Sequence, residues 1–255
     1  MAVEFTVTLS RPIAVEVEVD YAVTPLTAST GDFTLATGTL TVPAGETSVP
    51  LSVTVNGDAV SEGNETFLVT LSGATHAILA DAQGIGTIVD DDPPPTVVIT
   101  GATVGEGDAG HTMALLRVSL VGSSGRPVSV QYGTAAGTAT SGRDFLPGSG
   151  SLVFPEGTTA GTLAVAMVGD LLAEPSEAFT VNLTSAQNAT IATPQAVVTI
   201  NDDDSLPALS VADVRVNEGH MGSRNALFKV TLSAPAPEDV SVDWQTGGDL
   251  SLIHI

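Results

Sequence analysis

Two stretches decide the fold of this chain: GDAVSEGNETFLVTLS at residues 57–72 and GDLLAEPSEAFTVNLT at residues 169–184. In each stretch, three acidic residues are followed by Phe, Val and Leu at every second position. Apolar residues that alternate in this way predict a β-strand with one buried face. The second stretch follows the first by 112 residues, so the acids recur together with the strand.

The offset of 112 residues extends to acidic residues along most of the chain. The repeated pairs are Asp32 and Asp144, Asp58 and Asp170, Glu62 and Glu174, Glu65 and Glu177, Asp90-Asp91-Asp92 and Asp202-Asp203-Asp204, and Glu106 and Glu218. Apolar positions repeat because each copy needs a core, but carboxylates in loops have no packing reason to repeat. A hard cation bound by each copy would supply that reason.

The composition excludes several classes of function. The chain has 255 residues with 29 acids against 7 bases, which gives a formal net charge of -22 and argues against nucleic-acid binding. Cysteine is absent, so no disulfide or thiolate chemistry is expected. No apolar run approaches the roughly 20 residues of a membrane helix, so we expect no membrane span. The first residues, MAVEFTVTLS, lack the features of a signal peptide and resemble the inside of a strand, which predicts a truncated start.

The second copy predicts seven short strands with no helical periodicity. The candidate strands are Val97–Val104, Met113–Leu120, Val128–Tyr132, Ser151–Phe154, Gly161–Val168, Phe179–Thr184 and Ala196–Ile200. Clusters of Gly, Pro, Ser and Asp separate them, as in antiparallel β-sandwiches. The expected fold is therefore all-β, with tandem immunoglobulin-like sandwiches of about seven strands arranged end to end. Aromatic residues at repeated positions are expected in the cores: Phe67, Phe179, Tyr21, Tyr132 and Trp244.

The repeat divides the chain into three predicted copies and a tail. Residues 1–92 form a copy without its first strand, residues 96–204 a complete copy, and residues 208–249 the N-terminal part of a third. Short linkers that contain proline join them and should limit flexibility. The last six residues, LSLIHI at 250–255, break the pattern. They can be back-translated as CTG TCT CTT ATA CAC ATC, which resembles a transposon end used as a sequencing adapter, so we expect a non-native tail.

The acidic residues have the chemistry of a calcium site. Calcium prefers about six to eight oxygen ligands and tolerates flexible geometry, whereas magnesium demands a tighter octahedron and zinc favours His or Cys. The complete copy offers eight carboxylates as candidate ligands: Glu106, Asp144, Asp170, Glu174, Glu177, Asp202, Asp203 and Asp204. The first copy offers seven: Asp32, Asp58, Glu62, Glu65, Asp90, Asp91 and Asp92. Glu218 stands alone in the third copy and is expected to be a solvated surface residue. The alternative for every copy is a solvated, turn-rich surface, on which Asp occurs because it favours turn conformations.

Several short motifs of the second copy together resemble a Calx-beta repeat of the bacterial surface-protein type. They are Val104-Gly105-Glu106-Gly107, Ser141-Gly142-Arg143-Asp144-Phe145, Pro155-Glu156-Gly157, Gly169-Asp170 with Glu174, Glu177 and Phe179, and Ile200-Asn201-Asp202-Asp203-Asp204. The family includes the calcium-binding domains of sodium–calcium exchangers. The resemblance implies an immunoglobulin-like sandwich that binds calcium at one end through the carboxylates named above. Exchanger domains that hold several ions have an acid where this chain has Gly57 and Gly169, so one or two ions per copy are expected.

These features predict a non-catalytic protein, since no nucleophile elbow, P-loop, EF-hand loop or metalloprotease helix is present. We expect a calcium-binding structural or adhesive module of a secreted or cell-surface bacterial protein, in which calcium stiffens loop ends and junctions between copies. Its partners would be calcium and other surface proteins or matrix polysaccharide. Two alternatives stay open: a calcium-sensing regulatory domain of a membrane protein, and a non-catalytic appendage of a secreted enzyme. A carbohydrate-binding module is disfavoured because only one Trp and two Tyr could stack on sugars.

Overall fold

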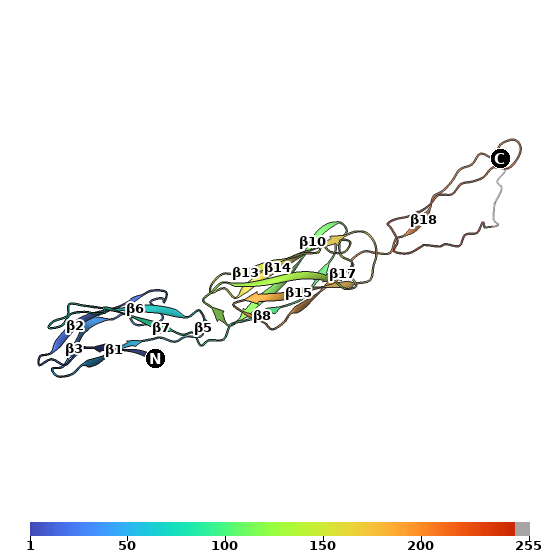
Figure 1. Ribbon diagram of the computed structural model, residues 1–255. Coiled ribbons are helices and arrows are strands. Elements are labelled where there is room, and N and C mark those ends of the chain that lie inside the picture. The colour runs from blue at the N-terminus through green and yellow to red at the C-terminus, as the bar shows by residue number, and fades with distance from the viewer. Residues whose placement is uncertain (248–255) are drawn as a thin grey trace.

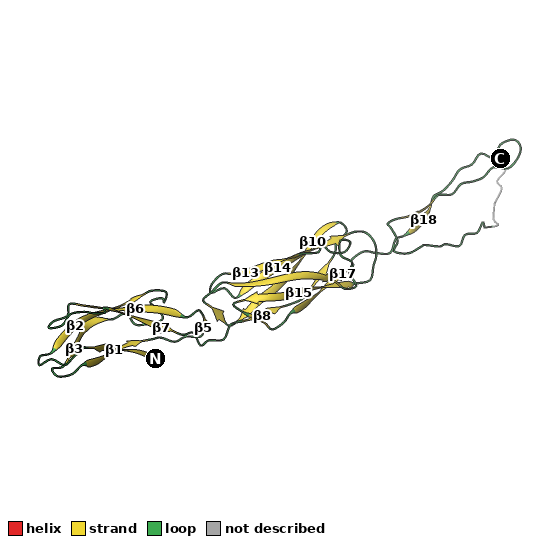
Figure 2. Ribbon diagram, in the orientation of Figure 1, coloured by secondary structure: helices red, strands yellow, loops and turns green. Residues whose placement is uncertain are grey.

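The computed structural model describes residues 1–247, which form strands and turns without any helix. Figure 1 shows two sandwich units placed end to end, followed by an open excursion of the chain that carries β18 (Leu209–Val211). Figure 2 shows the same units by secondary structure, and only strands and loops are present in the described range. That range accordingly holds no helix able to cross a membrane. The prediction of tandem immunoglobulin-like all-β sandwiches is confirmed.

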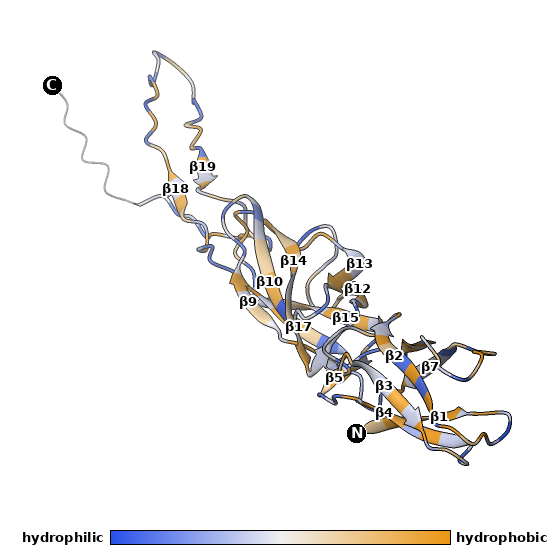
Figure 3. Ribbon diagram, turned by 90° about the vertical axis from the view of Figure 1, so that its left-hand side faces the viewer, coloured by the Kyte–Doolittle hydropathy of each residue, from blue (hydrophilic) through white to orange (hydrophobic). Residues whose placement is uncertain are grey.

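The second copy is built from two sheets that enclose one core. One sheet has the strand order β14-β10-β8-β16, and the other has the order β13-β12-β15-β17-β9. The first contains β8 (Thr96–Ile99), β10 (Gly110–Val121), β14 (Ala160–Gly169) and β16 (Thr190–Ile191). The second contains β9 (Ala102–Gly105), β12 (Val128–Ala136), β13 (Ser149–Phe154), β15 (Glu177–Gln187) and β17 (Gln195–Asn201). Figure 3 shows apolar colouring along β9 and β10, which belong to different sheets.

The prediction of one continuous first strand over Val97–Val104 is wrong. The chain leaves one sheet after β8, which pairs antiparallel with β10, and enters the other as β9, which pairs parallel with β17. Gly101 lies at the crossing, where a Cβ atom would overlap the carbonyl oxygen of Val197. Only glycine permits so close a backbone approach, so the strand changes sheets at this residue. The change of sheet carries Glu106 to the end of the five-stranded sheet.

Alternating apolar residues fill the core of the second copy as predicted. The strand residues expected to face inward are buried: Leu163, Val165 and Met167 on β14, and Phe179, Val181 and Leu183 on β15. Phe145 stacks on Phe179 with ring centroids 4.1 Å apart and an interplanar angle of 8°. Both rings are fully buried, and Phe145 immediately follows Asp144. The core therefore fixes the position of a candidate ligand directly.

The first copy repeats this plan with two sheets. One sheet pairs β1 (Ala2–Thr8) with β4 (Ser48–Thr54), and the other has the order β3-β2-β6-β7. The strands of the larger sheet are β2 (Val17–Pro25), β3 (Thr37–Val42), β6 (Glu65–Ser72) and β7 (Gln83–Ile88). Phe33 stacks on Phe67 with centroids 4.9 Å apart, in the same way as the Phe pair of the second copy. The aromatic pair is thus a shared feature of both cores.

The two cores fill their volume with different residues at matched positions. Phe5 lies opposite Leu51 in the first copy, where Leu116 lies opposite Leu163 in the second. Gly86 lies opposite Phe67, where Val198 lies opposite Phe179. A Cβ atom at Gly86 would overlap the ring of Phe67. The larger Phe5 and the smaller Gly86 offset one another, as cores that conserve volume require.

Residues 208–247 contain one short antiparallel pair of strands. β18 pairs antiparallel with β19 (Val230–Leu232), and the residues of both strands are exposed. The predicted strand Phe228–Leu232 therefore starts two residues later. The prediction of a buried Trp244 is wrong, since its side chain is 84% exposed, whereas Tyr21 and Tyr132 at the matching positions are half-buried against the other two cores. The predicted tail at 250–255 lies outside the described residues.

A short parallel bridge joins the first copy to the second. β5 (Val60–Ser61) pairs with β11 (Ser123–Ser124), and Gly125 N–H donates to the carbonyl oxygen of Ser61 at 3.0 Å. Ser61 and Ser124 are both buried by this contact. The linker between the copies is also anchored, because the carbonyl oxygen of the buried Pro95 accepts a bond from Thr190 N–H at 2.9 Å. The loop that carries Glu62 therefore continues directly into the junction.

The exchange of large and small core residues between the two copies predicts the effect of replacing Gly86 by valine. Gly86→Val should lower the free energy of unfolding of the first copy by about 1–3 kcal/mol, because the new side chain displaces the Phe67 ring. Adding Phe5→Leu should recover part of this loss, since it restores the combination found in the second copy. Thermal unfolding of the whole chain measures both effects. Equal destabilisation by the single and double variants would contradict the compensation.

Candidate metal centre

Strand topology brings the acidic residues of the second copy to one end of the sandwich. Glu106 follows β9, and the Asp triplet follows β17, which runs parallel to β9 and so ends at the same edge. Glu177 opens β15, which is antiparallel to β17, and it lies opposite Ile200 at the end of that strand. Asp170 follows β14, whose last residue Gly169 lies opposite Gly110. Asp170 and Glu177 lie on one loop, so three segments deliver these carboxylates to one set of loops, and the segment with Asp144, between β12 and β13, is a fourth.

One cluster in the second copy consists of Glu106, Asp202 and Asp204. Each contributes a carboxylate oxygen, and these oxygens all lie within 4.8 Å of one another. Glu106 is only 6% exposed, and Asp204 Oδ2 is buried without any hydrogen-bond partner. A buried carboxylate oxygen without a donor or cation is energetically unfavourable. This cluster therefore has the oxygen ligands of a cation site, and one buried oxygen that a cation would stabilise.

A second cluster consists of Asp144, Glu174 and Glu177, whose carboxylate oxygens also lie within 4.8 Å of one another. A tight turn presents Asp144: its Oδ2 accepts from Thr140 N–H at 2.5 Å, and its own N–H donates to Thr140 O at 3.0 Å. Asp144 is 7% exposed. The Arg143 side chain donates from Nη2 to Glu174 Oε1 and places Nε 3.7 Å from Asp144 Oδ1. This cluster therefore already contains a positive group.

The first copy has a matching cluster of Asp32, Glu62 and Glu65, again with carboxylate oxygens within 4.8 Å. A turn one residue shorter presents Asp32, whose Oδ2 accepts from Ser29 N–H at 2.6 Å and whose own N–H donates to Ser29 O at 3.3 Å. The cluster opens into a cleft of about 240 Å³. All seven carboxylates predicted for this copy line the cleft: Asp32, Asp58, Glu62, Glu65, Asp90, Asp91 and Asp92.

Other predicted ligands lie beside the clusters rather than within them. Asp58 and Asp170 accept bonds from the N–H groups two residues ahead, at 2.8 Å and 2.7 Å, and so hold equivalent turns in the two copies. Asp203 is exposed and accepts from Gly107 N–H at 3.0 Å. Asp91 is also exposed. The compact clusters thus contain nine of the fifteen predicted residues.

Gly57 and Gly169, which precede Asp58 and Asp170 in the two copies, differ in their surroundings. Gly169 is buried, and a Cβ atom there would overlap the carbonyl oxygen of Gly107. Gly57 has no heavy atom within 4 Å of such a Cβ. Backbone packing therefore excludes any acidic side chain at this position in the second copy, but not in the first.

Crowding of the carboxylates raises the pKa values of the glutamates. Burial raises the pKa of Glu106 to about 7, with the negative charges of Asp170, Asp202 and Glu174 adding to the effect. Burial and a hydrogen bond to Asp144 raise the pKa of Glu177 to about 7, and burial and a hydrogen bond to Asp32 do the same for Glu65. A carboxylate that loses water beside other carboxylates favours its neutral form. Each cluster therefore retains protons near neutral pH unless a cation replaces them.

Some contributors to the site were missed by sequence reasoning. One is Arg143, and its position next to Asp144 in the sequence could have indicated that it lies beside the cluster. Burial raises the pKa of Asp204, and the negative charges of Asp108, Asp202 and Asp203 add to this rise. Glu156 adds to the raised pKa of Glu62 although it belongs to the other copy. No local pattern reveals this last proximity, because it depends on the junction between the copies.

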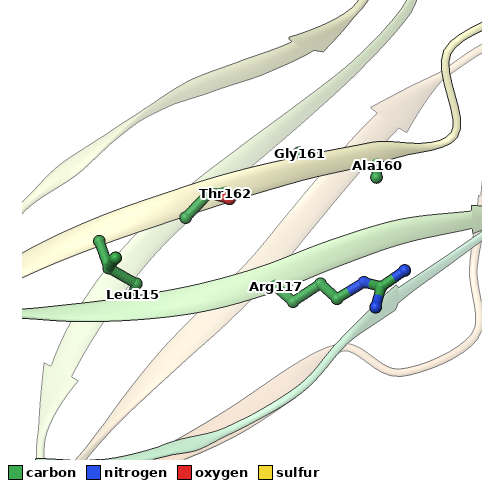
Figure 4. Close-up of a pocket in the computed structure, with 5 residues that line it drawn as sticks. All are labelled: Leu115, Arg117, Ala160, Gly161 and Thr162. Carbon is green, nitrogen blue, oxygen red and sulfur yellow. The ribbon is translucent and has the colours of Figure 1, made fainter.

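A separate depression of about 310 Å³ lies on the outer face of the four-stranded sheet. Figure 4 shows its lining residues on β10 and β14: Leu115, Arg117, Ala160, Gly161 and Thr162. No carboxylate lines it, and Arg117 supplies its charge. The depression has no part in the acidic clusters.

The raised pKa values predict how stability depends on pH when no cation is present. Between pH 4.5 and about 7 the folded glutamates hold protons that the unfolded chain has released. Stability must then fall as pH rises through this window. We expect the thermal midpoint in cation-free buffer to be higher near pH 5 than near pH 7.5. The Glu106→Gln/Glu177→Gln variant should flatten the dependence in the second copy, and a native slope in that variant would contradict the assignment.

Two large proteins are similar in sequence to part of this chain. It is 29% identical over 181 residues to adhesion G-protein coupled receptor V1 of Danio rerio, covering 68% of this chain and 3% of the receptor. It is 28% identical over 161 residues to FRAS1-related extracellular matrix protein 2 of Homo sapiens, covering 62% of this chain and 5% of that protein. The chain thus spans a small fraction of these relatives.

Among solved structures, the apo-form Calx CBD1 domain is 29% identical, with a TM-score of 0.41, and the match covers 44% of this chain and 100% of that domain. The Calx-beta domain family model matches residues 1–93 and, a second time, residues 90–204. These two matches take in most of the 255 residues, and the chain belongs to the Calx-beta domain family.

Proposed function

We propose that each of the first two copies binds calcium at its acidic loop end. The observation that carries this proposal is the convergence of three carboxylates in each cluster, with one buried oxygen of Asp204 left without a partner. The donors are all oxygen, as calcium prefers, and no His or Cys belongs to any cluster found within residues 1–247. Two clusters in the second copy and one in the first agree with the expected one or two ions per copy. Membership of a family of calcium-binding modules supports the same assignment.

The residues that would hold the ions follow from the clusters. Glu106, Asp202 and Asp204 would bind one ion, Asp144, Glu174 and Glu177 another, and Asp32, Glu62 and Glu65 the ion of the first copy. Asp58, Asp90, Asp91, Asp92, Asp170 and Asp203 would add to the negative potential or complete the coordination. Bound calcium would neutralise the carboxylates and replace the protons that they otherwise retain.

The role of calcium would be mechanical rather than catalytic. Glu62 directly follows β5, which pairs with β11 of the next copy, so ordering the loop of Glu62 would also order the junction. We infer a structural or adhesive module of a secreted or cell-surface protein, in which calcium stiffens loop ends and junctions. Similarity to segments of an adhesion receptor and an extracellular matrix protein supports this setting.

Calcium titration of the whole chain tests the sites. Asp202→Asn/Asp204→Asn should abolish one binding event, because both substitutions remove ligands from the cluster with Glu106. The matched control is Asp203→Asn, which changes an exposed neighbour outside the cluster and should leave that event in place. Isothermal calorimetry measures both. If calcium produces no binding heat with the native chain, the proposal is wrong.

Calcium should also change stability and shape. An ion that binds only the folded state stabilises it by about 2.7 kcal/mol at a concentration one hundred times its dissociation constant. We therefore expect calcium to raise the thermal midpoint and to narrow the distribution of end-to-end lengths seen by small-angle scattering. If chelator leaves both quantities unchanged, calcium does not stiffen the chain.

A further inference from the structure

The two copies differ in the turn beside otherwise matching clusters, because the turn before Asp144 is one residue longer than the turn before Asp32. Arg143 precedes Asp144 in the second copy, whereas Gly31 precedes Asp32 in the first. Arg143 Nη2 donates to Glu174 Oε1, and its Nε lies 3.7 Å from Asp144 Oδ1. Both ion pairs found within residues 1–247 are made by Arg143. The cluster of Asp32, Glu62 and Glu65 shows no such partner in that range.

We propose that Arg143 is a tethered counter-cation that occupies the Asp144–Glu174–Glu177 cluster and competes with calcium for it. The proposal rests on the proposed calcium-binding function of these clusters. It makes the two copies unequal: the first depends on calcium to neutralise its carboxylates, and the second carries its own positive charge at the same place.

The chemistry of arginine makes this competition direct. A guanidinium has only N–H donors and stays charged throughout the physiological pH range, so it cannot itself be a ligand of calcium, and its positive charge repels the ion. Calcium would displace it from Glu174 Oε1 or bind beside a like charge with lower affinity. The Arg143 side chain is 53% exposed, against 16% for Glu174 and 9% for Asp144. The arginine can therefore swing into solvent while the acids keep their places.

The surroundings of the glutamates agree with a neutralising role. Burial and neighbouring acids raise the pKa of Glu174, and the charge of Arg143 opposes part of this rise. The pKa of Glu62 at the matching position is raised by burial and by four neighbouring acids. The guanidinium thus performs in the second copy part of what an ion would do in the first.

The first copy can accept the reciprocal change. Gly31 does not have the left-handed backbone that only glycine favours, and a Cβ atom there would come no closer than 3.3 Å to a heavy atom, the hydroxyl of Ser29. Gly31→Arg should therefore introduce a guanidinium beside Asp32, with the Ser29 hydroxyl shifting by a few tenths of an ångström to make room. The pair of exchanges tests the same contact in two contexts.

The experiment compares calcium binding and calcium-free stability in the full chain. Arg143→Gln removes the charge and keeps most of the side chain, Arg143→Lys keeps the charge, and Gly31→Arg adds it to the first copy. Arg117→Gln is the control, since it makes the same change in net charge on the outer sheet face, away from the acids (Figure 4).

We expect Arg143→Gln to tighten calcium binding at one site by about tenfold, the scale on which a nearby opposite charge shifts a carboxylate equilibrium. It should also lower the thermal midpoint in cation-free buffer more than Arg117→Gln does. Arg143→Lys should stay close to the native chain, and Gly31→Arg should weaken one site and raise the cation-free midpoint.

The outcomes separate this inference from the function on which it rests. If the native chain binds calcium and Arg143→Gln binds it no more tightly than Arg117→Gln, the competition is overturned and the calcium sites stand. If neither the native chain nor any variant binds calcium, both the function and the competition are overturned. An unchanged cation-free midpoint in Arg143→Gln would overturn the neutralising role independently of calcium.

Discussion

Repulsion between carboxylates that a rigid β-sandwich holds at one end is the constraint on which this molecule depends. The carboxylates cannot move apart, because the strands that carry them are tied into the sheets and, at Asp144, to the stacked Phe145–Phe179 pair. Their negative charge must therefore be balanced where it is created. Protons, a tethered guanidinium and a bound divalent cation are three ways to balance it.

The inner faces of the strands could be predicted because they follow a period of two. Phe179, Val181 and Leu183 are buried as alternation requires. The acids could be predicted to cluster because strand ends meet in a sandwich, and the structure brings nine of the fifteen into compact groups. Which carboxylates would become direct neighbours depends on loop conformation, which carries no such period.

Other features were beyond sequence reasoning because they arise from tertiary contacts. The change of sheet at Gly101 depends on its approach to Val197, almost 100 residues away. The Arg143–Glu174 pair spans 31 residues, and the β5–β11 bridge spans two copies. Trp244 was expected in a core because its repeat position is aromatic, but the described residues 208–247 offer it no opposing sheet.

The bridge between the copies has a consequence for a chain under tension. A pulling force that separates the copies reaches two residues of parallel pairing at Val60–Ser61 before it reaches the ten-residue ladder between β10 and β14. We expect the pairing of β5 with β11 to break first, so that the chain lengthens at the junction between the copies while both cores remain folded. Since the joint adjoins the Glu62 carboxylate, the ionic composition of the surrounding fluid would set the force at which such an array begins to stretch.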